Sequence, residues 1–171
     1  MAQPDHLRRI HIWLAVFITG LVLSGVTAFP LQSELGWLVH LLHTSWLLPI
    51  AKSTQLLPWI ERVNEALSTT NGHYPFLAYG TDWLAFAHLV IAIAFIGPWI
   101  DPVRNKWVIT FGLIACAGVI PLALIAGPIR GIPLPWRLID CSFGVPGSVP
   151  LLMCRRSIIA LERLKPCISR N

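Results

Sequence analysis

Long apolar runs, separated by short polar or proline-containing segments, dominate the pattern of this chain. A helix needs roughly 20 mostly apolar residues to cross about 30 Å of hydrocarbon. Four runs reach or approach that length: residues 10–29, 79–100, 102–126 and 136–154. The pattern therefore predicts an all-α integral membrane protein built as a four-helix bundle.

Turn and capping residues give the expected ends of these helices. Asp101-Pro102 has the order of an N-cap followed by proline at the first helical position, so the third helix is predicted to start there. Pro121 removes a backbone hydrogen bond and predicts a kink in that helix. The run 136–154 is expected to be the least regular, because it contains two glycines, two prolines and Asp140.

Residues 31–78, between the first two runs, carry a mixed pattern. The segment 31–50 is apolar but holds Glu34 and two histidines, whereas 54–68 places apolar residues at helical spacing opposite a polar face. Asn71-Gly72 is a typical turn sequence. We expect 31–78 to form an extracytoplasmic cap of two interfacial helices.

The distribution of basic residues decides whether residues 31–50 form a fifth span. Short cytoplasmic loops of bacterial membrane proteins retain positive charge. If 31–50 crosses, the basic residues divide almost evenly, six against seven; if it does not, nine face four. The uneven division predicts four spans, one membrane domain over residues 1–171, and both termini in the cytoplasm, with 155–171 as a tail. The nine are Arg8, Arg9, Arg104, Lys106, Arg155, Arg156, Arg163, Lys165 and Arg170, and the four are Lys52, Arg62, Arg130 and Arg137.

Composition agrees with a location in the bacterial inner membrane. Hydrophobic residues make up 55% of the 171 residues and charged residues only 12%, more apolar surface than one soluble core of this size can bury. Because the basic residues behind the net charge of +5 flank apolar runs, we expect lipid contacts and no nucleic-acid partner. The sequence does not decide whether the protein forms a homo-oligomer or belongs to a larger membrane complex.

Ionisable residues at the predicted outer face are the candidates for function, because a charge at membrane depth costs a few kcal/mol unless it is paired or hydrated. Each also has a structural explanation. Asp82 suits the start of a helix, Asp140 lies three residues after Arg137 and can pair with it, and His88 can bond a neighbouring helix. Arg130, in a turn rich in glycine and proline, either anchors that turn to Asp82 or Asp140 or receives an anion such as a lipid phosphate. The expected ligand-binding set is Asp82, His88, Arg130, Arg137 and Asp140.

His40 and His43 lie three residues apart, a spacing that metal-binding pairs use on one face of a helix. Asp82 or His88 could supply a further ligand. A polar stripe without metal is the alternative, and the four cysteines form no CxxC pair.

Parts of the sequence are similar to known groups of membrane proteins. His11-Ile12-Trp13, followed by Gly20 and Gly25, resembles the first helix of membrane b-type cytochromes, and this resemblance implies a haem-binding histidine. The segments PFLAYGTDWLAFAH, DPVRNKW and GPIRGIPLPWRLIDCSFG resemble a group of short uncharacterised bacterial polytopic membrane proteins. The layout is similar to the sterol- and lipid-handling four-helix family that includes the sigma-2 receptor.

Three functions are compatible with these features. The leading hypothesis is a non-enzymatic protein that binds a lipid-like ligand or a protein partner near its outer face, without a cofactor. The second is a redox protein that binds haem b or a metal through His88 with His40 or His43. The third is a membrane-embedded hydrolase or transferase that uses Asp82, His88 or Asp140 as a base. The sequence shows none of the familiar catalytic motifs, and catalysis stays undecided.

Overall fold

The computed structural model describes residues 2–164, and all its regular elements are helices. The all-α class is therefore confirmed for the described residues. In chain order the elements are α1 (Ala2–Ala28), α2 (Leu31–Thr44), α3 (Leu48–Ser53), α4 (Leu56–His73), the 3-10 helix η1 (Pro75–Ala78), α5 (Tyr79–Ala94), α6 (Ile96–Ile100), α7 (Lys106–Ile129) and α8 (Leu134–Leu164).

Three helical segments have the length and composition of membrane spans: Asp5–Ala28, Pro75–Ile100 and Lys106–Ile129. Only 17–22% of the residues in their most apolar windows are buried within the molecule. Most of their apolar surface therefore faces outward, where a bilayer would solvate it. The more polar α8 is not among these three.

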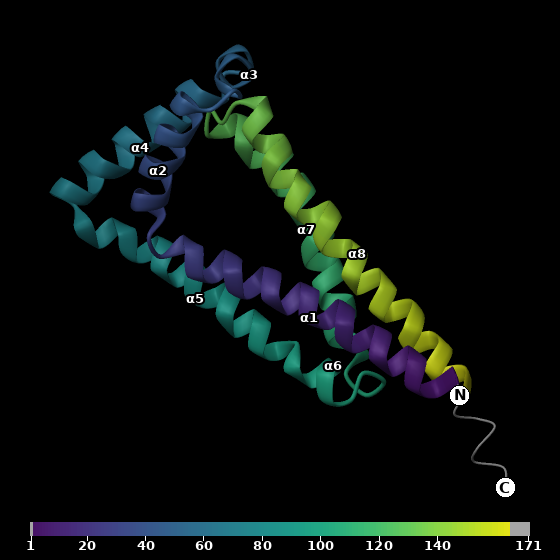
Figure 1. The fold of residues 1–171 in the computed structure, drawn as a ribbon. Helices are drawn as coiled ribbons and strands as arrows, with labels where there is room; N and C mark the ends of the chain where they lie inside the picture. Colours follow the sequence, from purple (N-terminus) through teal and green to yellow (C-terminus); the bar gives the residue numbers. More distant parts are fainter. Residues whose placement is uncertain (1, 165–171) are drawn as a thin grey trace, which may run out of the picture.

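The helices form a triangle with three sides (Figure 1). Two sides are pairs of long helices: α1 packed along α5, called the α1–α5 arm, and α7 packed along α8, called the α7–α8 arm. The third side is formed by α2, α3 and α4. The long helices pack in the order α5, α1, α8, α7, and the predicted four-helix bundle is not confirmed.

The largest core cluster lies where the start of α1 meets the end of α8. Ile10, Leu14, Phe95 and Ile109 are fully buried there against α8. The thiol of Cys154 approaches the carbonyl oxygen of Ile10 at 3.6 Å. The α8 residues that complete the core are Leu151, Cys154, Ile158 and Leu161.

Close backbone approach joins the two helices within each arm. A Cβ at Gly144 of α8 would lie 2.5 Å from the carbonyl oxygen of Cys116 in α7. A Cβ at Gly25 of α1 would lie 3.0 Å from the carbonyl oxygen of Ala85 in α5. Glycine at these positions lets the helices approach more closely than any side chain would allow, as expected for helices that associate in lipid.

The predicted cap is a second, smaller cluster. Leu35 and Leu42 of α2 pack against Leu57 and Ile60 of α4. Trp136, near the start of α8, packs on the same cluster and connects it to the α7–α8 arm.

Several expected boundaries were wrong. The third long helix begins at Lys106 and not at Pro102, because the Asp101 carboxylate accepts the backbone N–H of Arg104 at 3.0 Å in a turn before it. Asn71-Gly72 lies within α4 and is not a turn. The region 31–78 contains three α-helices instead of two, and α8 continues past Cys154 to Leu164; residues 165–171 of the predicted tail lie outside the described residues.

Candidate functional site

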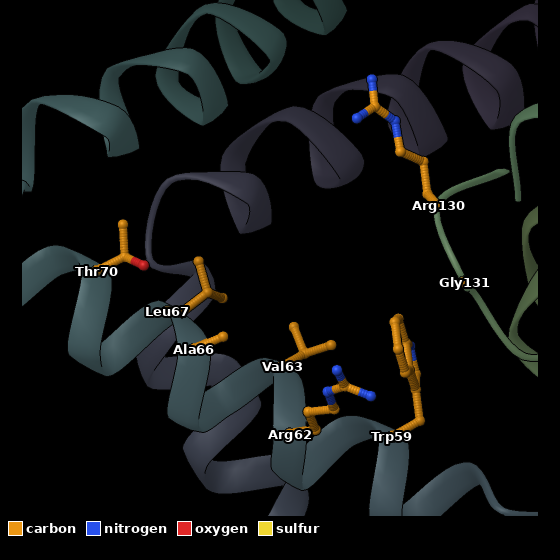
Figure 2. Close-up of a pocket in the computed structure, with 8 residues that line it drawn as sticks. All are labelled: Trp59, Arg62, Val63, Ala66, Leu67, Thr70, Arg130 and Gly131. Carbon is orange, nitrogen blue, oxygen red and sulfur yellow. The ribbon is translucent and has the colours of Figure 1, made fainter.

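A pocket of about 400 Å³ lies between α4 and the turn that joins α7 to α8. Figure 2 shows its wall on α4, from which the side chains of Trp59, Val63 and Leu67 project to the same side. Arg62 belongs to the same helix and Arg130 to the turn. The residues that line the pocket are Trp59, Arg62, Val63, Ala66, Leu67, Thr70, Arg130 and Gly131.

The α4 side of the pocket follows from how this helix packs. Leu57 and Ile60 are buried against α2, and this contact fixes the rotation of α4 about its axis. Residues 62 and 63 follow residue 59 by three and four positions, and 66 and 70 continue this spacing, so these residues form a stripe along one side of the helix. The stripe is apolar except for Arg62 and Thr70.

A tight helix C-terminus positions Arg130. Gly131 has φ +67°, a left-handed conformation that favours glycine. The backbone N–H of Ile132 donates to the carbonyl of Gly127 at 2.9 Å, and the N–H of Gly131 donates to that of Pro128 at 3.1 Å. These two bonds form a Schellman motif, which holds the residue before the glycine in a defined place.

Both pocket arginines are exposed and have no acidic partner among residues 5–164. The two ion pairs in this part of the chain are elsewhere: His43 with Glu61 at 2.7 Å, and Lys106 with Glu162 at 2.8 Å. No carboxylate lines the pocket. The pocket therefore combines an apolar wall with two uncompensated positive charges, an arrangement suited to an anionic group carried on an apolar molecule.

Asp82 and His88 are separate from this pocket. Asp82 lies in the first turn of α5, where a carboxylate offsets the positive end of the helix dipole. The Nδ1 atom of His88 lies 2.8 Å from the carbonyl oxygen of Leu84 in the same helix, so it bonds its own helix and not a neighbouring one. Neither residue lines the pocket.

Arg137 and Asp140, on α8, are half-buried and do not line the pocket either. In the described part of the chain they form no ion pair with each other, and none links Arg130 to Asp82 or Asp140. The aliphatic part of the Arg137 side chain lies against Gly127, and its buried Nε has no hydrogen-bond partner among the described groups. We find a packing role for Arg137 that spacing alone did not indicate.

The histidines proposed for metal or haem have other contacts. His43 pairs with Glu61, while His40 is exposed on α2. His11 stacks on Trp99 with ring centroids 4.7 Å apart, and its Nε2 lies 3.0 Å from the Trp99 carbonyl oxygen. In the described range, no three His, Cys, Asp or Glu residues come close enough to hold a metal ion. A metal site at His40 and His43 stays an untested prediction.

Sequence reasoning missed two residues of the pocket, Trp59 and Arg62. Both lie in the segment 54–68, which the sequence predicts to be an interfacial helix with one apolar and one polar face. The stripe that contains both has helical spacing, and this signal was present in the sequence. The proximity of the stripe to Arg130 depends on tertiary structure, which the spacing does not report.

No protein-family model matches this chain, and comparison with curated proteins and with solved structures found no similar protein.

Proposed function

We propose that this chain is a four-span membrane protein that binds the anionic head of a lipid-like molecule in the pocket between α4 and the α7–α8 turn, without catalysing a reaction. The observation that carries the proposal is the pair of unpaired arginines, Arg62 and Arg130, beside an apolar wall. The volume of about 400 Å³ suits the head and first carbons of an amphipathic molecule.

The contacts of α8 support its role as the fourth span. Cys154 lies beside Ile10, and a Cβ at Gly147 would be 3.9 Å from the ring of Phe17, so α8 runs antiparallel to α1. Residues 141–154 carry no charged side chain. They extend over about 21 Å at 1.5 Å per residue, and the flanking arginine side chains can reach toward the interfaces on either side.

The charge distribution supports an outer location for the pocket. The predicted cytoplasmic end holds Arg8, Arg9 and Arg104 together with the basic end of α8, whereas the cap end carries fewer basic residues. The pocket arginines would then lie near the outer headgroup layer, where lipid phosphates are found. The membrane is the bacterial inner membrane in this proposal.

The site differs from the one expected from sequence. The ligand-binding set expected from the sequence is Asp82, His88, Arg130, Arg137 and Asp140. Of these, Arg130 alone lines the pocket, and the second arginine that lines it is Arg62.

Native mass spectrometry of detergent-purified protein tests the proposal. We expect the wild-type protein to retain a lipid adduct and the Arg62→Gln/Arg130→Gln variant to retain at least about tenfold less, because charged hydrogen bonds contribute about 1.5–3 kcal/mol each. Arg104→Gln/Arg163→Gln is the matched control, since both residues are exposed and remote from the pocket. Equal adducts in all three proteins would contradict the proposal.

A further inference from the structure

The charges that line the pocket bear on which lipid it would take. Arg62 and Arg130 are the ionisable side chains among the lining residues, and both are cationic. The nearest acidic neighbour of Arg62 in sequence, Glu61, is engaged with His43 of α2 at 2.7 Å. The site therefore presents two positive charges and no negative charge to a bound head.

A zwitterionic headgroup fits this set poorly. Phosphatidylethanolamine and phosphatidylcholine carry a cationic amine a few atoms from the phosphate. That amine would lie in the field of two guanidinium groups, and the lining side chains offer it one oxygen, the hydroxyl of Thr70. Like charges placed together without an acceptor oppose binding, so the pocket discriminates by repulsion as well as attraction.

The positions of the two arginines favour phosphate over carboxylate. Arg62 comes from α4 and Arg130 from the turn before α8, and their side chains extend in different directions (Figure 2). A guanidinium group donates through a planar fork, and each fork needs its own acceptor oxygens. The oxygens of a phosphate are arranged tetrahedrally around phosphorus and accept hydrogen bonds from several directions, whereas the two oxygens of a carboxylate lie in one plane.

We infer that the pocket selects phospholipids whose head carries net negative charge, such as phosphatidylglycerol or phosphatidic acid, over zwitterionic phospholipids and fatty acids. This inference rests on the proposed function and deepens it. The apolar side chains of Val63, Ala66 and Leu67 contact the glycerol and the first acyl carbons, while Arg62 and Arg130 bind the phosphate.

Titration of the purified, delipidated full-length protein in detergent tests the inference. The ligands are dioleoyl phosphatidylglycerol, phosphatidic acid, phosphatidylethanolamine and phosphatidylcholine, together with oleate and inorganic phosphate. We expect both anionic phospholipids to bind at least about tenfold more tightly than each of the other ligands. This preference should disappear in Arg62→Gln/Arg130→Gln and persist in Arg104→Gln/Arg163→Gln.

The possible failures are distinguishable. If the four phospholipids bind equally, or if the preference survives in Arg62→Gln/Arg130→Gln, headgroup selection is overturned while lipid binding stands. Inorganic phosphate that binds as tightly as phosphatidylglycerol would overturn the phospholipid assignment. If no lipid of any class binds, the proposed function itself fails.

Discussion

The two ends of this molecule differ in how completely their side chains are buried and paired. At the end where α1 begins and α8 ends, side chains such as Ile10, Phe95 and Leu151 are completely buried, and Lys106 is paired with Glu162. At the cap end the arms separate (Figure 1), a pocket opens, and Arg62 and Arg130 have no partner among the described residues. The larger buried cluster lies at the first end, which we expect to maintain the fold, and the pocket with its two arginines lies at the second, where we propose that a ligand binds.

The largest expected difference between the two ends is the side of the membrane that each occupies. In a background without native cysteines, we expect Ser68→Cys in α4 to react with an impermeant maleimide in intact spheroplasts. Arg104→Cys and Arg163→Cys should react only after permeabilisation, because α8 returns to the side on which α7 begins. Labelling of Ser68→Cys and Arg104→Cys from the same side would contradict the topology, and labelling of Arg163→Cys in intact cells would remove α8 as a span.

Truncation of a side chain in the largest core cluster, where α1 begins and α8 ends, should have the next largest effect, on stability. Phe95 is fully buried, its ring centroid lies 4.7 Å from that of Phe17, and we expect Phe95→Ala to lower the unfolding free energy by about 3 kcal/mol. Phe143→Ala is the control, because Phe143 is 68% exposed. Thermal unfolding in one detergent compares the two variants. An equal loss of stability would show that the largest core cluster does not stabilise the protein more than the exposed surface does.

The contact between α7 and α8 predicts that alanine substitution at two glycines of these helices has different effects on the free energy of unfolding. Gly144→Ala places a Cβ against the Cys116 carbonyl and should destabilise the protein by about 1–3 kcal/mol. Gly118→Ala should be neutral or stabilise by up to about 1 kcal/mol, since nothing lies within 4 Å of its Cβ position and alanine is the better helix former. Comparable melting temperatures for the two variants would refute the close approach.

The ion pair of the cap should contribute least. His43 and Glu61 are 46% and 43% exposed, and an exposed pair of this kind contributes less than about 1 kcal/mol. We expect Glu61→Gln to shift the melting temperature only slightly more than Glu65→Gln, which removes an exposed carboxylate without an ion-pair partner in the described part. A shift as large as that of Phe95→Ala would mean that the cap end carries the stability of the fold.

The sequence predicted the long helices more completely than the pocket. Hydrophobic length located the long helices, although the predicted span 79–100 is divided into α5 and α6 after Ala94. The start of α7 was missed because the Asp101 carboxylate caps a turn, a choice between two local structures that Asp-Pro alone does not determine.

The pocket was predicted only in part, and the reason is tertiary. Arg130 stood out because its turn is rich in glycine and proline, and the left-handed Gly131 explains that composition. Arg62 looked like one more polar residue of an interfacial helix. Its role depends on how Leu57 and Ile60 fix α4 against α2, which brings two arginines 68 positions apart to the same pocket.

The most direct test of the central claim is a crystal structure of the protein grown from a lipidic phase that contains phosphatidylglycerol. The account predicts density for a lipid head within about 3 Å of the guanidinium groups of both Arg62 and Arg130, with its chains beside Val63 and Leu67. A pocket closed by protein side chains, or arginines paired with carboxylates of this chain, would contradict it.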